Sequence, residues 1–92
     1  MMNLQENIQR IKEMMNPKGW AESSNKLTKE FKFDTFDDSI DFVNKVARIA
    51  EKQNHHPDIV IKFDKVIISI TDHEKGGVSE KCHKFVKSVN DL

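Results

Sequence analysis

Apolar residues recur along the chain with two different periods, and these periods predict where strands and helices lie. In the runs Asp58–Phe63 and Val66–Thr71, an apolar residue stands at every second position and β-branched residues are frequent. This alternation is typical of strands with one buried face. Between residues 35 and 54 the apolar residues instead recur every three to four positions, which predicts an amphipathic helix.

The predicted central helix carries signals at both ends. Thr35 is a favourable N-cap, and two aspartates in the first turn interact well with the positive end of the helix dipole. Pro57 cannot lie inside a helix and disfavours helical geometry at the preceding residue, so we expect the helix to end near Asn54 or His55. Its apolar stripe is broad enough to need a sheet beneath it. The stripe comprises Phe36, Ile40, Val43, Ala47 and Ala50, widened by Phe42, Val46 and Ile49.

The two predicted strands are expected to form a hairpin with a tight turn at Asp64 and Lys65. In this register all six apolar side chains lie on one face, and a slip by one residue would scatter them. The opposed pairs are Phe63 and Val66, Ile61 and Ile68, and Ile59 and Ile70. Extended outward, the register places His56 opposite His73, about 5 Å apart at Cβ. We therefore expect His55, His56 and His73 to meet at one place.

The remaining segments predict two more helices and two more strands. Residues Asn3–Met15 have helical spacing, and the segment from Gly19 predicts a short strand, a polar turn at Ser23–Asn25 and a strand over Leu27–Phe33. Ser79 is expected to cap a last helix, whose stripe comprises Cys82, Phe85 or Val86, Val89 and Leu92. The predicted order α-β-β-α-β-β-α indicates an α+β fold, a four-stranded antiparallel sheet with helices packed on one face.

Length and charge narrow the class of protein. Ninety-two residues suffice for one domain only, so we expect residues 1–92 to form a single unit. Fifteen basic and fifteen acidic residues cancel, which argues against direct nucleic-acid binding. No apolar run approaches the roughly 18 residues of a membrane-spanning helix, and no signal-peptide core begins the chain. With Cys82 as the single cysteine, we expect a cytoplasmic protein without an internal disulfide or a membrane anchor.

The clustered histidines suggest acid–base chemistry. Histidine titrates near about pH 6.5, so one ring can act as an acid and another as a base at neutral pH. The negative end of the preceding helix favours protonation of a nearby imidazole, and Glu51 lies one turn before His55, on the same side. His55 and His56 are consecutive and point in different directions, so we expect them to have different tasks.

The residues alone leave other interpretations open. Three histidines can bind zinc with an open position, but the chain has no HExxH helix and no paired cysteine spacing. Alternatively, the histidines only form hydrogen bonds at a helix end, without chemistry. Trp20 can either stack on a flat ligand or cover the edge of the core. The pattern by itself indicates only that a small ligand can meet two or three proton-transfer groups.

Two stretches resemble the signature of the pterin-4a-carbinolamine dehydratases. They are AEKQNHHPDI, which ends at Ile59, and KVIISITDHEKGGVSEK, which begins at Lys65; the resemblance extends back to Gly19-Trp20. It implies a hydro-lyase that dehydrates 4a-hydroxytetrahydrobiopterin to quinonoid dihydrobiopterin, in tetrahydrobiopterin recycling after aromatic amino acid hydroxylation. It also implies no metal, no organic cofactor, and a homodimer or homotetramer.

Matching motif positions imply roles for the site residues. His55 and His73 correspond to the proton-transfer pair, His56 mainly positions the pterin, and Glu51 orients or tunes the cluster. The other positions expected to bind the substrate are Asn54, Thr71, Asp72, Glu74 and, as a stacking residue, Trp20.

One departure and one alternative accompany the resemblance. Cys82 stands where most family members carry an aspartate, so a carboxylate near Ser79 is missing from the first turn of the last helix. Some members bind a homeodomain transcription factor and stabilise its dimers. The second hypothesis is therefore a non-catalytic interaction protein, a dimerisation cofactor or transcriptional coactivator with a vestigial pterin pocket.

Overall fold

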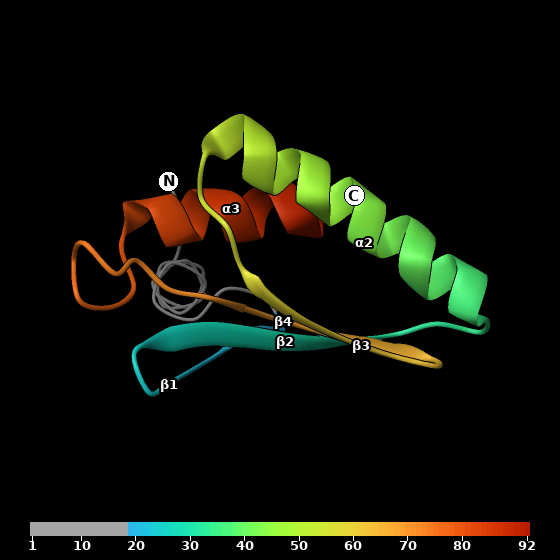
Figure 1. Ribbon diagram of the computed structural model, residues 1–92. Coiled ribbons are helices and arrows are strands. Elements are labelled where there is room, and N and C mark those ends of the chain that lie inside the picture. The colour runs from blue at the N-terminus through green and yellow to red at the C-terminus, as the bar shows by residue number, and fades with distance from the viewer. Residues whose placement is uncertain (1–18) are drawn as a thin grey trace, which may run out of the picture.

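The computed structural model describes residues 19–92, which form a four-stranded sheet covered on one face by two helices (Figure 1). This arrangement confirms the predicted α+β class and the order of these elements. The helix predicted over residues 3–15 lies outside the described residues. The strands are β1 (Ala21–Ser23), β2 (Lys26–Lys32), β3 (Asp58–Lys62) and β4 (Lys65–Ile70), and the helices are α2 (Phe36–Gln53) and α3 (Glu80–Asn90).

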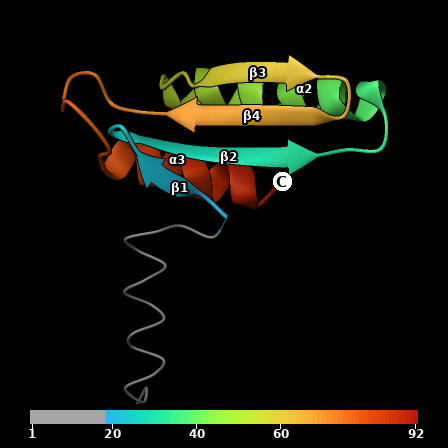
Figure 2. The ribbon, with the colours of Figure 1, turned by 90° about the horizontal axis from the view of Figure 1, so that it is seen from below.

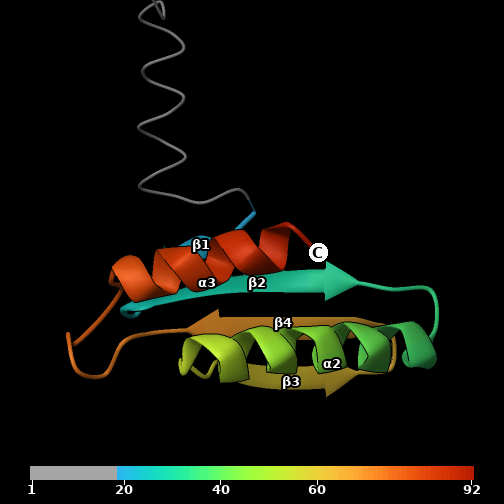
Figure 3. The same cartoon turned by 90° about the horizontal axis from the view of Figure 1, so that it is seen from above.

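The sheet has the strand order β1-β2-β4-β3, and all neighbours run antiparallel. Seen from the helical side, α3 lies over β1 and β2, and α2 lies over β4 and β3 (Figure 3). Among the described residues, no helix covers the opposite face of the sheet (Figure 2). Neither α2 nor α3 is both long and apolar enough to cross a membrane.

The central strand β4 supplies the middle of the hydrophobic core. Its alternate residues Val66, Ile68 and Ile70 are fully buried under the helices, as the two-residue period predicts. The neighbouring strand β2 adds Leu27. The core is completed by Trp20, by Val46 and Ala50 of α2, and by Cys82, Phe85, Val86 and Val89 of α3.

Three residues of the predicted helix stripes are exposed, so these predictions are wrong. Phe36 is the first residue of α2, and Leu92 follows the end of α3. Both therefore lie beyond the turns that face the sheet. Ala47 is also exposed because it stands about 100° around the helix from the buried Val46.

The first hairpin turns at Ser24 and Asn25, as predicted. Both residues have positive φ angles, 52° and 62° respectively. A two-residue turn with two positive φ angles matches the right-handed twist of the flanking strands, and asparagine tolerates this conformation well. The turn brings β1 back along β2 in the register that pairs Ser23 with Lys26.

The second hairpin has a register two residues away from the predicted one. Ile61 pairs with Val66 and Ile59 with Ile68, so the turn consists of Phe63 and Asp64. A shift of two residues keeps every side chain on its predicted face, but it moves Phe63 out of the ladder and leaves it 70% exposed. The position of the turn agrees with a tertiary hydrogen bond of 2.8 Å, which the backbone N–H of Phe33 donates to the carbonyl of Asp64.

The new register also corrects the pairing expected for the histidines. Extended outward from Ile59 and Ile68, it aligns His56 with Thr71 rather than with His73. The strand ladder therefore does not place His56 opposite His73. The neighbourhood of the two segments is kept, because the start of β3 still lies beside the end of β4.

Both predicted ends of α2 are confirmed. The Thr35 hydroxyl accepts a hydrogen bond of 3.1 Å from the backbone N–H of Asp38, which satisfies one free donor of the first turn. At the other end Asn54 has a left-handed conformation with a φ of 50°. The helix therefore stops there, and the chain changes direction before His55.

We expect Thr35→Ala to lower the free energy of unfolding by about 1 kcal/mol, because the mutant leaves that N–H without its side-chain acceptor. Urea unfolding followed by circular dichroism measures the change. Thr35→Ser keeps the hydroxyl and is the matched control. Equal losses in both variants would show that the cap does not stabilise the helix.

Candidate functional site

The histidines lie where the end of α2 meets the end of β4. The chain leaves α2 at Asn54, passes through His55 and His56, and enters β3 at Asp58. Because β3 runs antiparallel to β4, this segment lies beside the residues that follow Ile70. Two segments that are distant in the sequence therefore form one site.

His55 is half-buried and bonded to the strand end. Its Nε2 lies 2.7 Å from the backbone carbonyl oxygen of Thr71, and a carbonyl can only accept, so Nε2 donates. In the neutral ring, Nδ1 then carries the lone pair. Among the described residues Nδ1 has no hydrogen-bond partner, and it is buried. The ring also packs edge-on against Phe85, with 6.4 Å between centroids.

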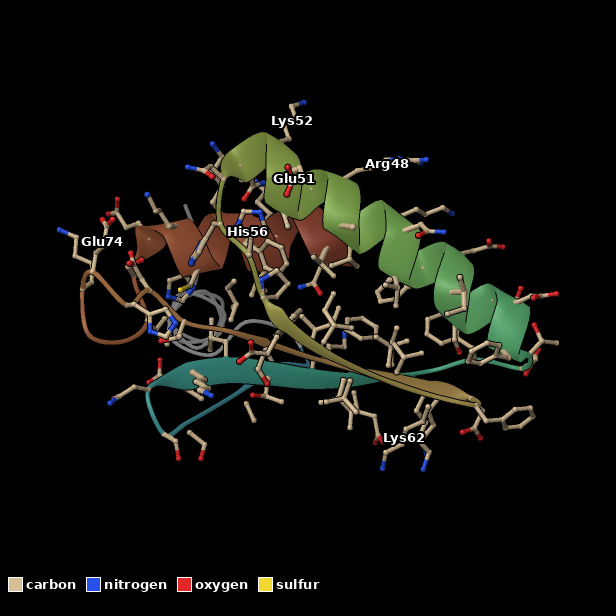
Figure 4. The ribbon with its side chains drawn as sticks, viewed as in Figure 1. Arg48, Glu51, Lys52, His56, Lys62 and Glu74 are labelled. Carbon is tan, nitrogen blue, oxygen red and sulfur yellow. The ribbon has the colours of Figure 1, made fainter. Side chains whose placement is uncertain are left out.

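His56 turns the other way and pairs with Glu51. Its Nε2 donates to Oε1 of Glu51 at 2.8 Å, and both side chains are exposed. Figure 4 shows Glu51 on the last turn of α2, with His56 just below it. Helical spacing predicted that Glu51 lies on the side of His55, and in the structure its hydrogen-bond partner is the next residue, His56. The left-handed Asn54 ends the helical phase, so His55 turns to the strand and His56 turns back to Glu51.

Asp72 is 7% exposed, and both oxygens of its carboxylate are bonded within the chain. Oδ2 accepts a 2.7 Å hydrogen bond from the Ser79 hydroxyl, and Oδ1 accepts one of 3.1 Å from the N–H of Glu74. The Ser79 hydroxyl holds the pKa of this carboxyl below its ordinary value of 3.8. The N–H groups of Lys75 and Glu74 and the nearby His55 lower it further, against the opposing effect of burial.

The remaining predicted site residues lie at the end of β4, in the loop that follows it, and at the end of α2. His73 and Glu74 are exposed in the loop after β4, and Figure 4 shows Glu74 at the outer end of that loop. The Thr71 hydroxyl donates a hydrogen bond of 2.7 Å to the backbone carbonyl of Asn25, which ties the strand end to the first hairpin. Asn54 is exposed at the end of α2.

The structure places Trp20 in the core. The ring is 2% exposed and packs edge-on against Phe31, with 5.9 Å between centroids. Its Nε1 donates a hydrogen bond of 2.9 Å to Oδ1 of Asn90 in α3. A buried indole has no free face for a flat ligand, so this placement favours the interpretation that Trp20 covers the core.

The sequence interpretation missed the role of Ser79 at this site. Ser79 stands at the N-cap position of α3, as predicted, but its hydroxyl makes no capping hydrogen bond. The hydroxyl donates to Asp72, and a bond to an ionised carboxylate is a strong one. Ser79 and Asp72 are seven positions apart in the sequence, and only the fold of the loop between them brings their side chains together.

No metal-binding arrangement is found within residues 19–92. No three histidine, cysteine, aspartate or glutamate side chains there are grouped so that they could hold an ion. A hollow of about 730 Å³ lies elsewhere, between the end of β2 and the two helices. None of the three site histidines lines this hollow.

We expect Asp72 to make stability depend on pH in the acid range. Its folded-state pKa is below the ordinary value, so the ionised carboxylate stabilises the fold above about pH 4, and this contribution is lost as the pH falls through the folded-state pKa. Asp72→Asn should therefore be less stable than the wild type near neutral pH, with a difference that shrinks as the pH falls below the ordinary pKa of 3.8. Urea unfolding at a series of pH values measures this, and a pH-independent difference would contradict it.

Comparison with known proteins identifies relatives of the whole described region. A family model described as pterin 4 alpha carbinolamine dehydratase matches residues 4–92. A homologue of that enzyme from Picosynechococcus sp. is 45% identical over 73 residues, which cover 79% of each chain. Another, from Sulfolobus acidocaldarius, is 39% identical over 74 residues, which cover 80% of this chain and 81% of the relative.

Solved structures share the fold. The crystal structure of a transcriptional coactivator/pterin dehydratase from Brucella melitensis has a TM-score of 0.78 at 25% identity, covering 98% of this chain and 95% of the other. A pterin dehydratase-like protein identified as a RuBisCO assembly factor in the alpha-carboxysome has a TM-score of 0.69 at 22% identity, covering 82% and 89%. The second likeness concerns the fold alone.

Proposed function

The chain belongs to the pterin-4a-carbinolamine dehydratase family, and from this premise we propose that it dehydrates 4a-hydroxytetrahydrobiopterin to quinonoid dihydrobiopterin. The observation that carries the proposal is the contact between His55 and Thr71, two residues before His73. This contact joins the two segments whose residues match the family signature.

The proposed reaction needs two proton transfers. Loss of hydroxide from C4a requires an acid at the departing oxygen and a base at the ring N–H. Each such group typically contributes about 10²–10⁴-fold to the rate. Imidazoles serve both purposes near neutral pH, because either ring form is accessible there.

In this proposal His55 and His73 transfer the protons, and the exposed His56 positions the pterin with Glu51 as its fixed partner. His55 acts through Nε2, which in the structure donates a hydrogen bond to the Thr71 carbonyl. When substrate binds, one of its polar groups would replace that carbonyl as the partner of Nε2. The exposed ring of His73 is open to the substrate without any such exchange. The polar residues proposed to line the pterin site are Asn54, Thr71 and Glu74. Asp72 is the fourth residue that the family resemblance places there, but both of its carboxylate oxygens are bonded within the chain, so we assign it a supporting role.

A stopped-flow assay with enzymatically generated 4a-hydroxytetrahydropterin tests the function. We expect the protein to accelerate formation of the quinonoid product over the spontaneous reaction, in proportion to its concentration. Heat-denatured protein at the same concentration is the control. A rate equal to the spontaneous one at every concentration would refute the proposal.

A role in protein interaction is the second candidate. It is favoured by the likeness to a structure described as a transcriptional coactivator/pterin dehydratase.

Strand β3 also supports self-association, because it forms one edge of the sheet and its Val60 is half exposed. We propose a homodimer or homotetramer, and light scattering of the purified protein measures which one forms. A transcription factor or a hydroxylase-pathway protein that converts a tetramer into a mixed complex would support the second candidate.

A further inference from the structure

We propose that Asp72 and Ser79 are positioning residues that hold the loop bearing His73 against the start of α3. The inference rests on the proposed function, because it assigns His73 the task of proton transfer. Neither Asp72 nor Ser79 needs to touch the substrate for this purpose. Both oxygens of the carboxylate are already used inside the chain.

Asp72 organises the loop through its backbone as well as its side chain. Its N–H donates to the carbonyl of Gly77 at 2.9 Å, and its own carbonyl accepts from the N–H groups of Lys75 and Gly77, both at 3.1 Å. Its Oδ1 holds the N–H of Glu74. These bonds close a loop over residues 73–76, and all of them involve Asp72. Asp72 therefore restrains the backbone of His73.

The Ser79 hydroxyl connects this loop to the helix. The hydrogen bond between Ser79 Oγ and Asp72 Oδ2 is 2.7 Å long, is largely shielded from solvent and involves an ionised acceptor, a combination that makes it strong. It fixes the loop to α3, whose Phe85 packs against the His55 ring. The same helix therefore supports both proposed proton-transfer residues.

The carboxylate that meets Ser79 comes from the loop rather than from the helix. At position 82, where the family resemblance places an aspartate, this chain has a fully buried cysteine whose Sγ lies 3.9 Å from the Ser79 hydroxyl. Asp72 thus accepts the hydrogen bond of the Ser79 hydroxyl in this chain. Because Asp72 precedes His73, this bond connects the two ends of the His73 loop. A bond from Ser79 to an acid at position 82 would lie within the first turn of α3 and would not restrain the loop.

Replacing either partner is expected to loosen the loop and slow the chemical step more than it weakens substrate binding. For Ser79→Ala and Asp72→Asn we expect kcat to fall about 10- to 100-fold, with KM changed by no more than about threefold, since a misplaced catalytic group lowers the rate of the bound complex. Ser79→Thr retains the hydroxyl and should restore most of kcat. Ser69→Ala removes a serine hydroxyl that pairs with Thr28 between β4 and β2, and it is the matched control that should keep wild-type kcat.

Amide hydrogen exchange and the NMR titration of the His73 ring test the loop without any turnover. In both loosened variants we expect the Glu74 amide to exchange at least about tenfold faster and the His73 ring signals to shift, while amides of β4 exchange as in the wild type. Unchanged exchange and an unchanged His73 ring would overturn the inference, as would equal losses in Ser79→Thr and Ser79→Ala. If the wild type fails to dehydrate the pterin, the proposed function fails, but these two measurements still decide whether Asp72 and Ser79 hold His73.

Discussion

Replacing His55 or His73 with alanine is expected to lower the rate of pterin dehydration by at least about tenfold while leaving the fold intact, because each imidazole is proposed to move a proton in the reaction. His73 is exposed, so its removal should cost little stability. His55→Ala also removes the bond to the Thr71 carbonyl. Single-turnover rates in the stopped-flow assay measure the effect, and circular dichroism checks the fold.

The fourth histidine provides the matched control. His83 lies in α3, at a position that belongs to neither of the two segments of the site. His83→Ala should keep the wild-type rate, and His56→Ala should raise KM more than it lowers kcat if His56 mainly positions the pterin. Near-wild-type rates for both His55→Ala and His73→Ala would remove the catalytic assignment and leave the family fold without its proposed chemistry.

Phe85→Ala is expected to have the largest effect on stability, a loss of about 3–5 kcal/mol in the free energy of unfolding. The side chain is fully buried between α3 and the sheet, so its removal loses apolar burial and leaves a cavity. A domain of this size is typically stable by only about 5–15 kcal/mol, so the variant is expected to be partly unfolded at moderate temperature. Urea unfolding of the two proteins measures the difference.

Phe63→Ala is the matched control for this prediction. It removes the same side chain from the exposed turn between β3 and β4, and the expected change is within about 0.5 kcal/mol. Because Phe85 also packs against the His55 ring, the Phe85 variant should lose dehydratase activity even under conditions where it remains folded. Similar stability losses for both phenylalanines would mean that the turn residue is buried in solution, for example against a second copy of the chain.

Local sequence signals were sufficient for the elements and for most of their faces. The alternation along β4 predicted that Val66, Ile68 and Ile70 are buried, and Pro57 and Thr35 predicted both ends of α2. Each of these signals acts over a few residues, through side-chain periodicity, a missing N–H or a capping hydroxyl. Such signals give the same answer in the isolated segment and in the folded chain.

Register and side-chain direction at the site required the tertiary structure. The two-residue shift of the β3–β4 hairpin keeps the apolar pattern unchanged, so the pattern could not distinguish the two registers. The hydrogen bond from Phe33 to Asp64 that accompanies the observed turn joins the residue after β2 to the turn between β3 and β4. Glu51 forms its hydrogen bond with His56 rather than with His55. This choice of partner depends on the left-handed backbone conformation of one residue, Asn54.

By itself, the sequence determined that two histidine-bearing segments belong to an α+β domain and that a helix end and a strand end bring them together. Only the tertiary structure decided that His55 bonds to Thr71, that Trp20 is buried, and that Ser79 binds Asp72 instead of capping α3. The physical reason is the range of the interactions. Periodicity and capping are local properties, whereas a hydrogen bond between distant residues exists only after packing has fixed both partners.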